Sequence, residues 1–395
     1  METHEGFSAN QPAGLGQPSG RAQLAPRGPA QALAVRSAAL VSRGLRDLAR
    51  DSNWLIKKVF AGRSSQLALS PAGELCALSP LVRQGAERIA LYDVERGVPT
   101  LALAVPGEPD MCPPGLPAAF AWSPTARHLV AAWGGWLPEL HIFDLHGKIF
   151  LGGFGDFQSF PANLAWSDSG KYFAAASRGG REAKLRLWPA AQPVGGAMPF
   201  AADPAAELGA PAAGDNWLEP AGGETESSGE SGFAGFGRLA FSPNESILAG
   251  VAEMQGDWAD DSIVLVSLPD FRRRTVVPGQ GRITDLAWTA DNRELIYCSG
   301  GQAYRVPARS RRSEALPFGA ELCAAHPHLP LALCFSSWLK NSAKGRLFLV
   351  DLSRLAVFDE YAAEGVVNLR WSLDGSRAYA VTSGGLAYLY EPPLL

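Results

Sequence analysis

A short phrase recurs along the chain: an apolar residue, a spacer, a second apolar or aromatic residue, and then Ser or Thr at the start of a turn. Six clear copies place the hydroxyl residue at Ser70, Ser123, Ser167, Ser242, Thr289 and Ser372. Alternating apolar residues before a Ser-Pro or Asp-Gly turn, with strand-forming residues after it, are typical of a β-hairpin. The chain is therefore expected to be a repeat protein built from hairpins.

The spacing of these copies indicates how many repeat units the chain holds. Successive hydroxyl residues are 53, 44, 75, 47 and 83 positions apart. A four-stranded unit takes about 40–45 residues. The longest interval therefore hides one degenerate copy, which we place at residues 322–327, and the interval of 75 holds one unit and an insertion. The sequence predicts seven units.

Each copy is followed by a further apolar strand, and several of these strands close with an acidic residue. The endings are Tyr92-Asp93, Phe143-Asp144, Val350-Asp351 and Tyr390-Glu391. They resemble the Trp-Asp ending of the WD-repeat family, and the resemblance covers residues 54–395. It implies an all-β fold, a single seven-bladed β-propeller, in a family whose members usually bind partners without catalysing a reaction. The Gly-His dipeptide of that family is absent from the repeats.

The ends of the chain and one long interval lie outside the seven units. Residues 54–60 have strand composition, and we expect them to supply the fourth strand of the last unit, which removes two open sheet edges. Residues 1–50 form an N-terminal extension that is expected to be disordered over 6–30. Residues 33–50 fit a short helix on the propeller, or a basic amphipathic helix for a membrane or an import receptor. Residues 202–233 are expected to be a flexible acidic insertion.

Composition narrows the classes of function. A net charge of -4 argues against nucleic-acid binding, which requires a basic surface. No apolar run approaches the length of a membrane span, so membrane association is not expected. The five cysteines are scattered and odd in number, which favours reduced thiols in a cytoplasmic protein. We expect no cofactor, and a monomer that works within a larger complex.

Tryptophan in the connections between second and third strands is the main functional signal. In a propeller these connections open onto one face, and tryptophan is enriched where interfaces gain most binding energy. Acidic residues in the same connections predict a rim that selects a basic protein or peptide. The predicted partner-binding residues are Trp133, Trp136, Trp258, Trp338, Asp257, Asp260 and Asp261.

Two other functions stay open. A basic strip on outer strands would suit anionic lipid, and its residues are Arg272, Arg273, Arg274, Arg309, Arg311 and Arg312. Phe271-Arg272-Arg273 resembles the signature of phosphoinositide-binding autophagy propellers, although Arg274 stands where that signature has glycine. The other alternative is a hydrolase or lactonase acting in the central channel.

Motifs for catalysis are missing from the sequence, and we expect the protein not to be an enzyme. There is no nucleophile elbow, phosphate loop or dinucleotide fingerprint. Cys323, His326 and His328 lie close together, but no fourth ligand is evident, so we expect them to be structural and predict no metal site.

Overall fold

The computed structural model describes most of the chain between residues 54 and 391. The described ranges are 54–60, 64–80, 87–104, 117–133, 139–179, 182–190, 199–201, 203–209, 232–256, 260–308, 310–337 and 345–391. The chain divides into a unit of residues 1–43 with residue 395, and a second unit of residues 44–394. All described residues belong to the second unit. The predicted N-terminal extension, residues 1–50, lies outside them.

The described residues form 28 strands in six antiparallel sheets and no α-helix. Four of the sheets have four strands in simple chain order. The first contains β2 (Ser64–Leu69), β3 (Leu75–Pro80), β4 (Glu87–Asp93) and β5 (Val98–Ala104), and the second β6 (Pro117–Trp122), β7 (His128–Trp133), β8 (Glu139–Asp144) and β9 (Ile149–Phe154). The others are β18 (Ile283–Trp288), β19 (Glu294–Ser299), β20 (Gln302–Pro307) and β21 (Glu314–Ala315), and then β22 (Leu322–Ala325), β23 (Leu331–Ser336), β24 (Gly345–Asp351) and β25 (Ala356–Ala363).

An eight-stranded sheet consists of two four-stranded groups. One group is β10 (Phe160–Trp166), β11 (Tyr172–Arg178), β12 (Lys184–Pro189) and β13 (Ala206–Gly209); the other is β14 (Phe233–Phe241), β15 (Ile247–Met254), β16 (Ser262–Ser267) and β17 (Arg273–Pro278). A single pair, Arg178 opposite Gly235, joins the groups. Gly235 has φ 151°, and a Cβ there would lie 2.6 Å from the Arg178 Cα, so only glycine permits the pairing.

The predicted insertion at 202–233 begins too early. Residues 206–209 form β13, which pairs with β12 as the outer strand of its group. The side chain of Glu207 in this strand bonds Lys184 Nζ at 2.7 Å and Arg186 Nε at 3.2 Å, which holds the polar segment on the sheet. Residues 210–231 lie outside the described residues.

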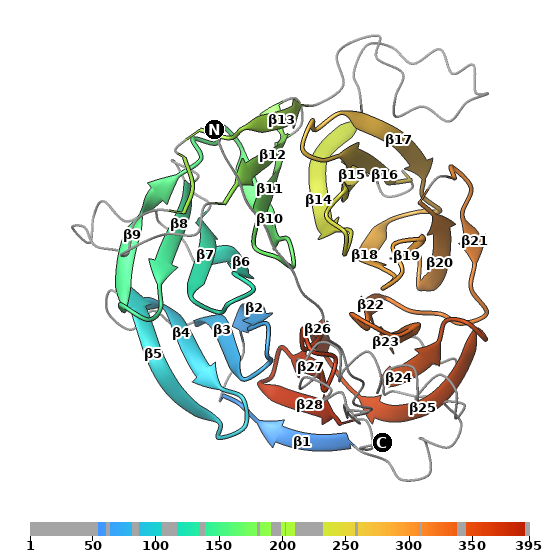
Figure 1. The fold of residues 1–395 in the computed structure, drawn as a ribbon. Coiled ribbons are helices and arrows are strands. Elements are labelled where there is room, and N and C mark those ends of the chain that lie inside the picture. The colour runs from blue at the N-terminus through green and yellow to red at the C-terminus, as the bar shows by residue number, and fades with distance from the viewer. Residues whose placement is uncertain are drawn as a thin grey trace, which may run out of the picture. The chain divides into compact units, whose positions relative to one another are not determined.

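The first strands of successive groups lie side by side. β2 neighbours β6, β6 neighbours β10, and the series continues through β14, β18 and β22 to β26 (Val366–Trp371), which returns to β2. The strands of this unit therefore surround a common centre, as Figure 1 shows, in an all-β, propeller-like fold. β22 confirms that a degenerate repeat copy begins at Leu322.

The predicted closing strand is confirmed. β1 (Trp54–Lys58) pairs antiparallel with β28 (Leu386–Tyr390), which is followed inward by β27 (Ala378–Thr382) and then β26. The Trp54 ring is only 8% exposed, and its centroid lies 5.1 Å from that of Tyr390 and 5.9 Å from that of Tyr361. A strand from the start of the described chain thus completes the sheet built by its end.

The core lies between neighbouring sheets. Every residue of β7, β23 and β27 is buried, because a second strand is covered by a sheet on each side and so carries a continuous apolar run. Cys76, Cys298 and Cys334 lie buried in equivalent second strands, as the repeat predicted. Burial raises the pKa of the Cys76 thiol to about 12, so this thiol stays protonated and packs as a small apolar group.

A recurring hydrogen bond explains the hydroxyl residue of the repeat. In each clear copy the side-chain oxygen accepts the backbone N–H of the residue five positions on, which begins the second strand or, in the last copy, directly precedes it. The distances are 3.0 Å for Ser70 and Leu75, 2.9 Å for Ser123 and His128, 3.0 Å for Ser167 and Tyr172, 3.0 Å for Ser242 and Ile247, 3.1 Å for Thr289 and Glu294, and 3.0 Å for Ser372 and Arg377. We call this arrangement the capped turn.

The acidic endings of the third strands perform a similar task. Asp93 Oδ1 accepts the Arg96 N–H at 2.8 Å, Asp144 Oδ1 accepts the His146 N–H at 2.9 Å, and Asp351 Oδ1 accepts the Ser353 N–H at 2.9 Å. Each carboxylate therefore closes the turn into the outer strand.

The docking of β1 predicts a difference between two neighbouring side chains. Trp54→Ala removes a buried ring and should lower the free energy of unfolding by about 3 kcal/mol. Leu55→Ala on the same strand removes a side chain that is 48% exposed, and should change it by less than about 0.5 kcal/mol. Urea unfolding of both variants measures the two values, and equal effects would show that β1 does not pack as described.

Candidate functional site

The structure corrects the prediction that Trp133 faces a partner. Trp133 is the last residue of β7 rather than part of the connection, and its ring is 1% exposed. The centroid of this ring lies 4.8 Å from that of His141, so the indole is core packing. Trp136, Trp258 and Trp338 lie outside the described residues.

The predicted acidic residues separate into a buried and an exposed one. Asp261 is 1% exposed, and its carboxylate accepts the N–H of Met254 at 3.0 Å and of Ile283 at 2.9 Å. The prediction that Asp261 contacts a partner is therefore wrong. Burial raises the pKa of Asp261, and its carboxylate joins the end of β15 to the start of β18 by hydrogen bonds. Asp260 is exposed, and Asp257 lies outside the described residues.

The two halves of the predicted basic strip are neighbours. Arg311 Nε donates to Thr275 Oγ1 at 3.1 Å, which links the segment after β20 to β17. Arg272, Arg311 and Arg312 are exposed. The side chains of Arg273 and Arg274, and the whole of Arg309, lie outside the described part of the chain.

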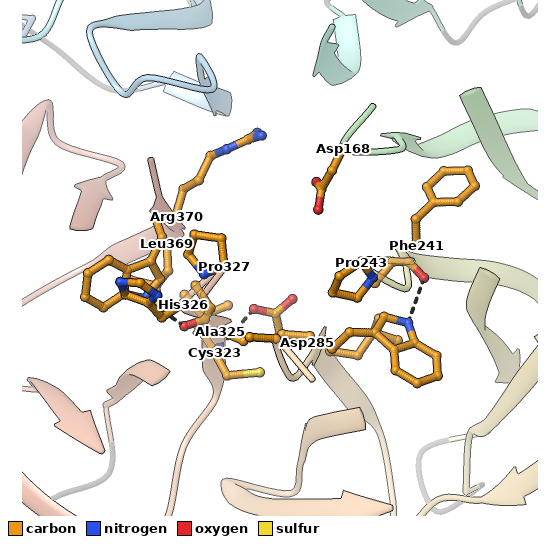
Figure 2. A pocket seen from close by; sticks show the side chains of 18 of the residues that line it. Asp168, Phe241, Pro243, Asp285, Cys323, Ala325, His326, Pro327, Leu369 and Arg370 are labelled. Carbon is orange, nitrogen blue, oxygen red and sulfur yellow. Dashed lines mark hydrogen bonds between the residues drawn. The ribbon is translucent and has the colours of Figure 1, made fainter. Parts of the chain in front are cut away.

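The inner strands enclose a central cavity whose charged lining residues the sequence did not identify. One part of about 300 Å³ is lined by β14, β18, β22 and β26 and by Asp168 of the turn after β10, and Figure 2 shows this part. A second part of about 310 Å³ is lined by β2, β6, β10, β14 and β26. Both parts are bordered by Arg238, Leu369 and Arg370.

The repeat places small residues at one position of the cavity wall. Two positions before the hydroxyl residue, or before His326 in the degenerate copy, the inner strand carries an alanine that lines the cavity in every copy but the last. These alanines are Ala68, Ala121, Ala165, Ala240, Ala287 and Ala324. In the last copy the same position is Arg370. The position directly after the hydroxyl residue, or after His326 in the degenerate copy, is occupied by Pro71, Pro124, Pro243, Ala290, Pro327 and Leu373. In the third copy this position is Asp168.

One pair of charged groups in the cavity has its partners within the protein. Arg238 Nε donates to the Thr284 carbonyl at 3.1 Å and lies 3.9 Å from Asp285 Oδ1. Asp285 Oδ2 in turn accepts the N–H of Cys323 at 3.0 Å. Burial raises the pKa of Asp285, while Arg238 and the N–H groups oppose that rise.

Arg370 and Asp168 form a second pair of charges, and these groups face each other across the cavity (Figure 2). Arg370 Nη1 has one long contact, 3.5 Å to the Leu69 carbonyl. Loss of hydration lowers the pKa of Arg370 and raises that of Asp168, and each charge partly opposes the shift of the other. Within the described ranges, neither group has an ion-pair partner within 4.0 Å.

His326 takes the place of the hydroxyl residue in the degenerate copy. Its Nδ1 accepts the N–H groups of His328 and Leu329, both at 3.0 Å, and Nε2 lies 3.1 Å from the Gly375 carbonyl. An Nδ1 that accepts two bonds carries no proton, so the Nε2 hydrogen is donated to Gly375. Burial lowers the pKa of His326 to about 4, and the ring is neutral at pH 7.

The imidazoles of His326 and His328 both contact backbone carbonyls of the next group. His328 Nε2 lies 3.0 Å from the Leu373 carbonyl, and both imidazoles therefore connect β22 to the next group. Among the described residues no set of three or more His, Cys, Asp or Glu side chains could hold a metal ion.

Comparison with known proteins places the fold but not the function. No protein-family model matches the sequence, and a search of curated proteins gives no significant match. The chain is similar to a solved structure of Kuenenia stuttgartiensis hydrazine synthase, at 13% identity and TM-score 0.59, over 83% of this chain and 95% of that one. It is also similar to a chain in the crystal structure of the Mitotic Checkpoint Complex, at 13% identity and TM-score 0.58, over 87% of this chain and 96% of that one. At such identities the likeness shows the fold alone.

The described residues contain no helix long and apolar enough to cross a membrane.

Sequence reasoning missed the cavity charges, although a signal was present. Leu369-Arg370-Trp371 breaks the pattern seen in Leu164-Ala165-Trp166 and Leu286-Ala287-Trp288, where the middle residue is alanine. A comparison of the copies position by position would have identified Arg370 and Asp168 as exceptions.

The neutral His326 predicts an acid-sensitive contribution to stability. Its folded pKa of about 4 lies below the ordinary value of 6.5, so the unfolded chain binds the proton more readily. The contribution is complete above pH 6.5 and is lost as the pH falls toward 4, by up to about 3 kcal/mol. His326→Ser supplies the hydroxyl of the other copies and should remove this part of the pH dependence in urea unfolding.

The exposed His146 provides the control for that measurement. His146→Ser should leave the wild-type slope of stability against pH between 6.5 and 4. If His326→Ser shows the same slope of stability against pH as wild type, the assignment of a neutral His326 imidazole is wrong.

Proposed function

We propose that the chain is a seven-bladed β-propeller of the WD-repeat type that acts as a non-catalytic scaffold for a protein or peptide partner. The grouping of strands supports this count: the eight-stranded sheet divides at the Arg178–Gly235 pair, and β1 joins the last group. The capped turns of six units and the acidic strand endings that close a turn in three units support the family.

The observation that carries the proposal is a set of indole bonds between neighbouring groups. Trp122 Nε1 donates to the Ala68 carbonyl at 3.0 Å, Trp288 Nε1 to Ala240 at 3.1 Å and Trp371 Nε1 to Ala324 at 3.1 Å. Each bond joins one inner strand to the inner strand of the preceding group. Inner strands joined in this way hold the connecting loops in place before a partner binds. Less conformational entropy is then lost on binding, which favours affinity.

The proposed binding face is the end of the ring where the second-to-third connections open. Second-to-third and fourth-to-first connections of antiparallel groups lie at the same end, and there Glu182, Asp260 and Glu364 are exposed. Two arginines at this end are paired: Arg178 bonds both carboxylate oxygens of Glu253, and Arg282 Nη1 lies 3.4 Å from Asp261 Oδ1.

The exposed acids at this end suit a basic partner. Trp136, Trp258 and Trp338 belong by sequence to connections at the same end, and we propose them as its anchors. We propose that the protein is cytoplasmic and works as one copy within a larger complex, and that it binds neither nucleic acid nor a cofactor.

Reversal of the exposed acids tests the face. A variant with Glu182→Lys, Asp260→Lys and Glu364→Lys should bind a basic peptide library at least about tenfold more weakly at low salt, because like charges then meet across the interface. Fluorescence anisotropy with the labelled library measures the change. A variant with Trp136→Ala, Trp258→Ala and Trp338→Ala should lose binding at all salt concentrations.

The opposite end of the ring offers a matched control. Glu74, Asp203 and Asp270 are exposed acids in first-to-second and third-to-fourth connections. Their reversal to lysine changes the net charge by the same amount and should leave most of the binding intact. Equal losses in both charge variants would mean that net charge, and not this face, controls binding.

A second candidate is recognition of an anionic membrane surface by the basic strip. The bond from Arg311 to Thr275 favours it, because the two arginine segments then act together. Exposed arginines on outer strands also prevent pairing between sheet edges, and that role needs no ligand.

Vesicle flotation decides between these roles. If the strip binds lipid, wild type should float with phosphatidylcholine vesicles that contain phosphatidylserine and phosphoinositide. A variant with Arg272→Glu, Arg273→Glu and Arg274→Glu should then stay at the bottom, since about 1 kcal/mol is lost for each basic residue.

A matched reversal elsewhere controls for net charge in the flotation. Exposed basic residues in groups that do not carry the strip are Arg96, Lys171 and Arg354, and the two arginine side chains are 80% and 51% exposed. Their reversal should leave flotation unchanged, and wild type that does not float removes the second candidate.

A further inference from the structure

The cavity holds two charges that the architecture of the repeat does not require. Six copies build the same turn and the same inner strand with alanine where the last copy has Arg370. The other copies manage with proline, alanine or leucine where the third has Asp168. Arg370 is half-buried, Asp168 is exposed, and both line the cavity; the loss of hydration at Arg370 is unfavourable without compensation.

The other charged pair of the cavity shows what compensation looks like. Asp285 has a backbone N–H at 3.0 Å and a guanidinium at 3.9 Å, and Arg238 has a carbonyl at 3.1 Å. Arg370 has only its 3.5 Å contact, and in the described part of the chain no hydrogen bond to the Asp168 carboxylate is found. Arg370 and Asp168 can therefore form more new hydrogen bonds with a ligand than Arg238 and Asp285 can.

We propose that the central cavity binds a small amino carboxylate, with the carboxylate of the ligand on Arg370 and its ammonium group on Asp168. Figure 2 shows the two side chains on opposite walls with open space between them. A volume of about 300 Å³ is at the small end of ligand pockets, which suits a metabolite of a few carbon atoms. This site is separate from the proposed partner-binding face.

Opposite charges on the two walls decide the class of ligand. A simple anion on Arg370 would be repelled by Asp168, and a simple cation on Asp168 would be repelled by Arg370. A molecule that carries both charges satisfies both walls at once. The planar guanidinium can also hold a carboxylate through two parallel hydrogen bonds.

Titration calorimetry with amino carboxylates of increasing charge separation tests the proposal. The probes are glycine, β-alanine, γ-aminobutyrate and ε-aminocaproate, each added to the full chain. At least one probe should bind, and the best one reports the separation of the two walls. Butyrate, which lacks the ammonium group, and butylamine, which lacks the carboxylate, should each bind at least about tenfold more weakly, because a charged partner is lost.

The repeat itself supplies variants that should fold. Arg370→Ala restores the residue of the six other copies, and Asp168→Ala introduces the residue found as Ala290 in the fifth. Each should weaken the best probe at least about tenfold while thermal unfolding stays cooperative. Glu74→Ala, at an exposed position outside the cavity lining, should leave the affinity unchanged.

Two results would overturn the proposal. One is the absence of binding by any probe at millimolar concentration, which would mean that the two charges are balanced by water alone. The other is equal affinity in wild type, Arg370→Ala and Asp168→Ala, which would place the ligand elsewhere. Neither result bears on the scaffold, because binding of the basic peptide library is measured separately.

Discussion

The capped turn is the bond on which the rest of the structure depends. Each inner strand must reverse direction within a few residues, and the side chain at the reversal accepts the first N–H of the second strand, as Ser242 does for Ile247. The capping hydroxyls are buried, so loss of one acceptor would leave a buried N–H without a partner. His326 differs from the hydroxyl residues, because its Nδ1 accepts the N–H groups two and three positions on, those of His328 and Leu329.

The capped turns also determine what faces the centre. They fix the register of each inner strand, and the residue two positions earlier then lies against the next inner strand. A tryptophan can reach a carbonyl there, as Trp288 reaches Ala240 at 3.1 Å, because the alanine side chain is small. Trp166 is the exception: its Nε1 has no partner among the described residues, and its ring packs on Phe173 and Phe200 instead. Mutual support between inner strands and an alanine-lined cavity are thus consequences of one geometry.

Periodicity made most of the fold predictable from the sequence, including the degenerate copy at Leu322 and the strand that begins at Trp54. Those inferences needed only spacing and strand composition, and neighbouring units supply the rest. The site was less predictable because it depends on strand ends and on contacts far apart in the chain. Trp133 lies one residue inside its strand, which turns a loop anchor into core. The buried carboxylate of Asp261 accepts the N–H of Ile283, 22 positions away in the sequence, and no local pattern reveals this contact.

Differences between copies carry information that the repeat average hides. Where six equivalent positions are alanine, alanine is sufficient for the strand, the turn and the indole bond, so Arg370 adds nothing to the architecture. The same holds for Asp168, since proline or alanine builds the equivalent turn. A half-buried charge that the fold does not need must have its lost hydration offset by something, and the residues around Arg370 offer only the 3.5 Å contact to the Leu69 carbonyl. An offset from a bound molecule is consistent with both exceptions facing one cavity, with opposite signs and from different groups of strands.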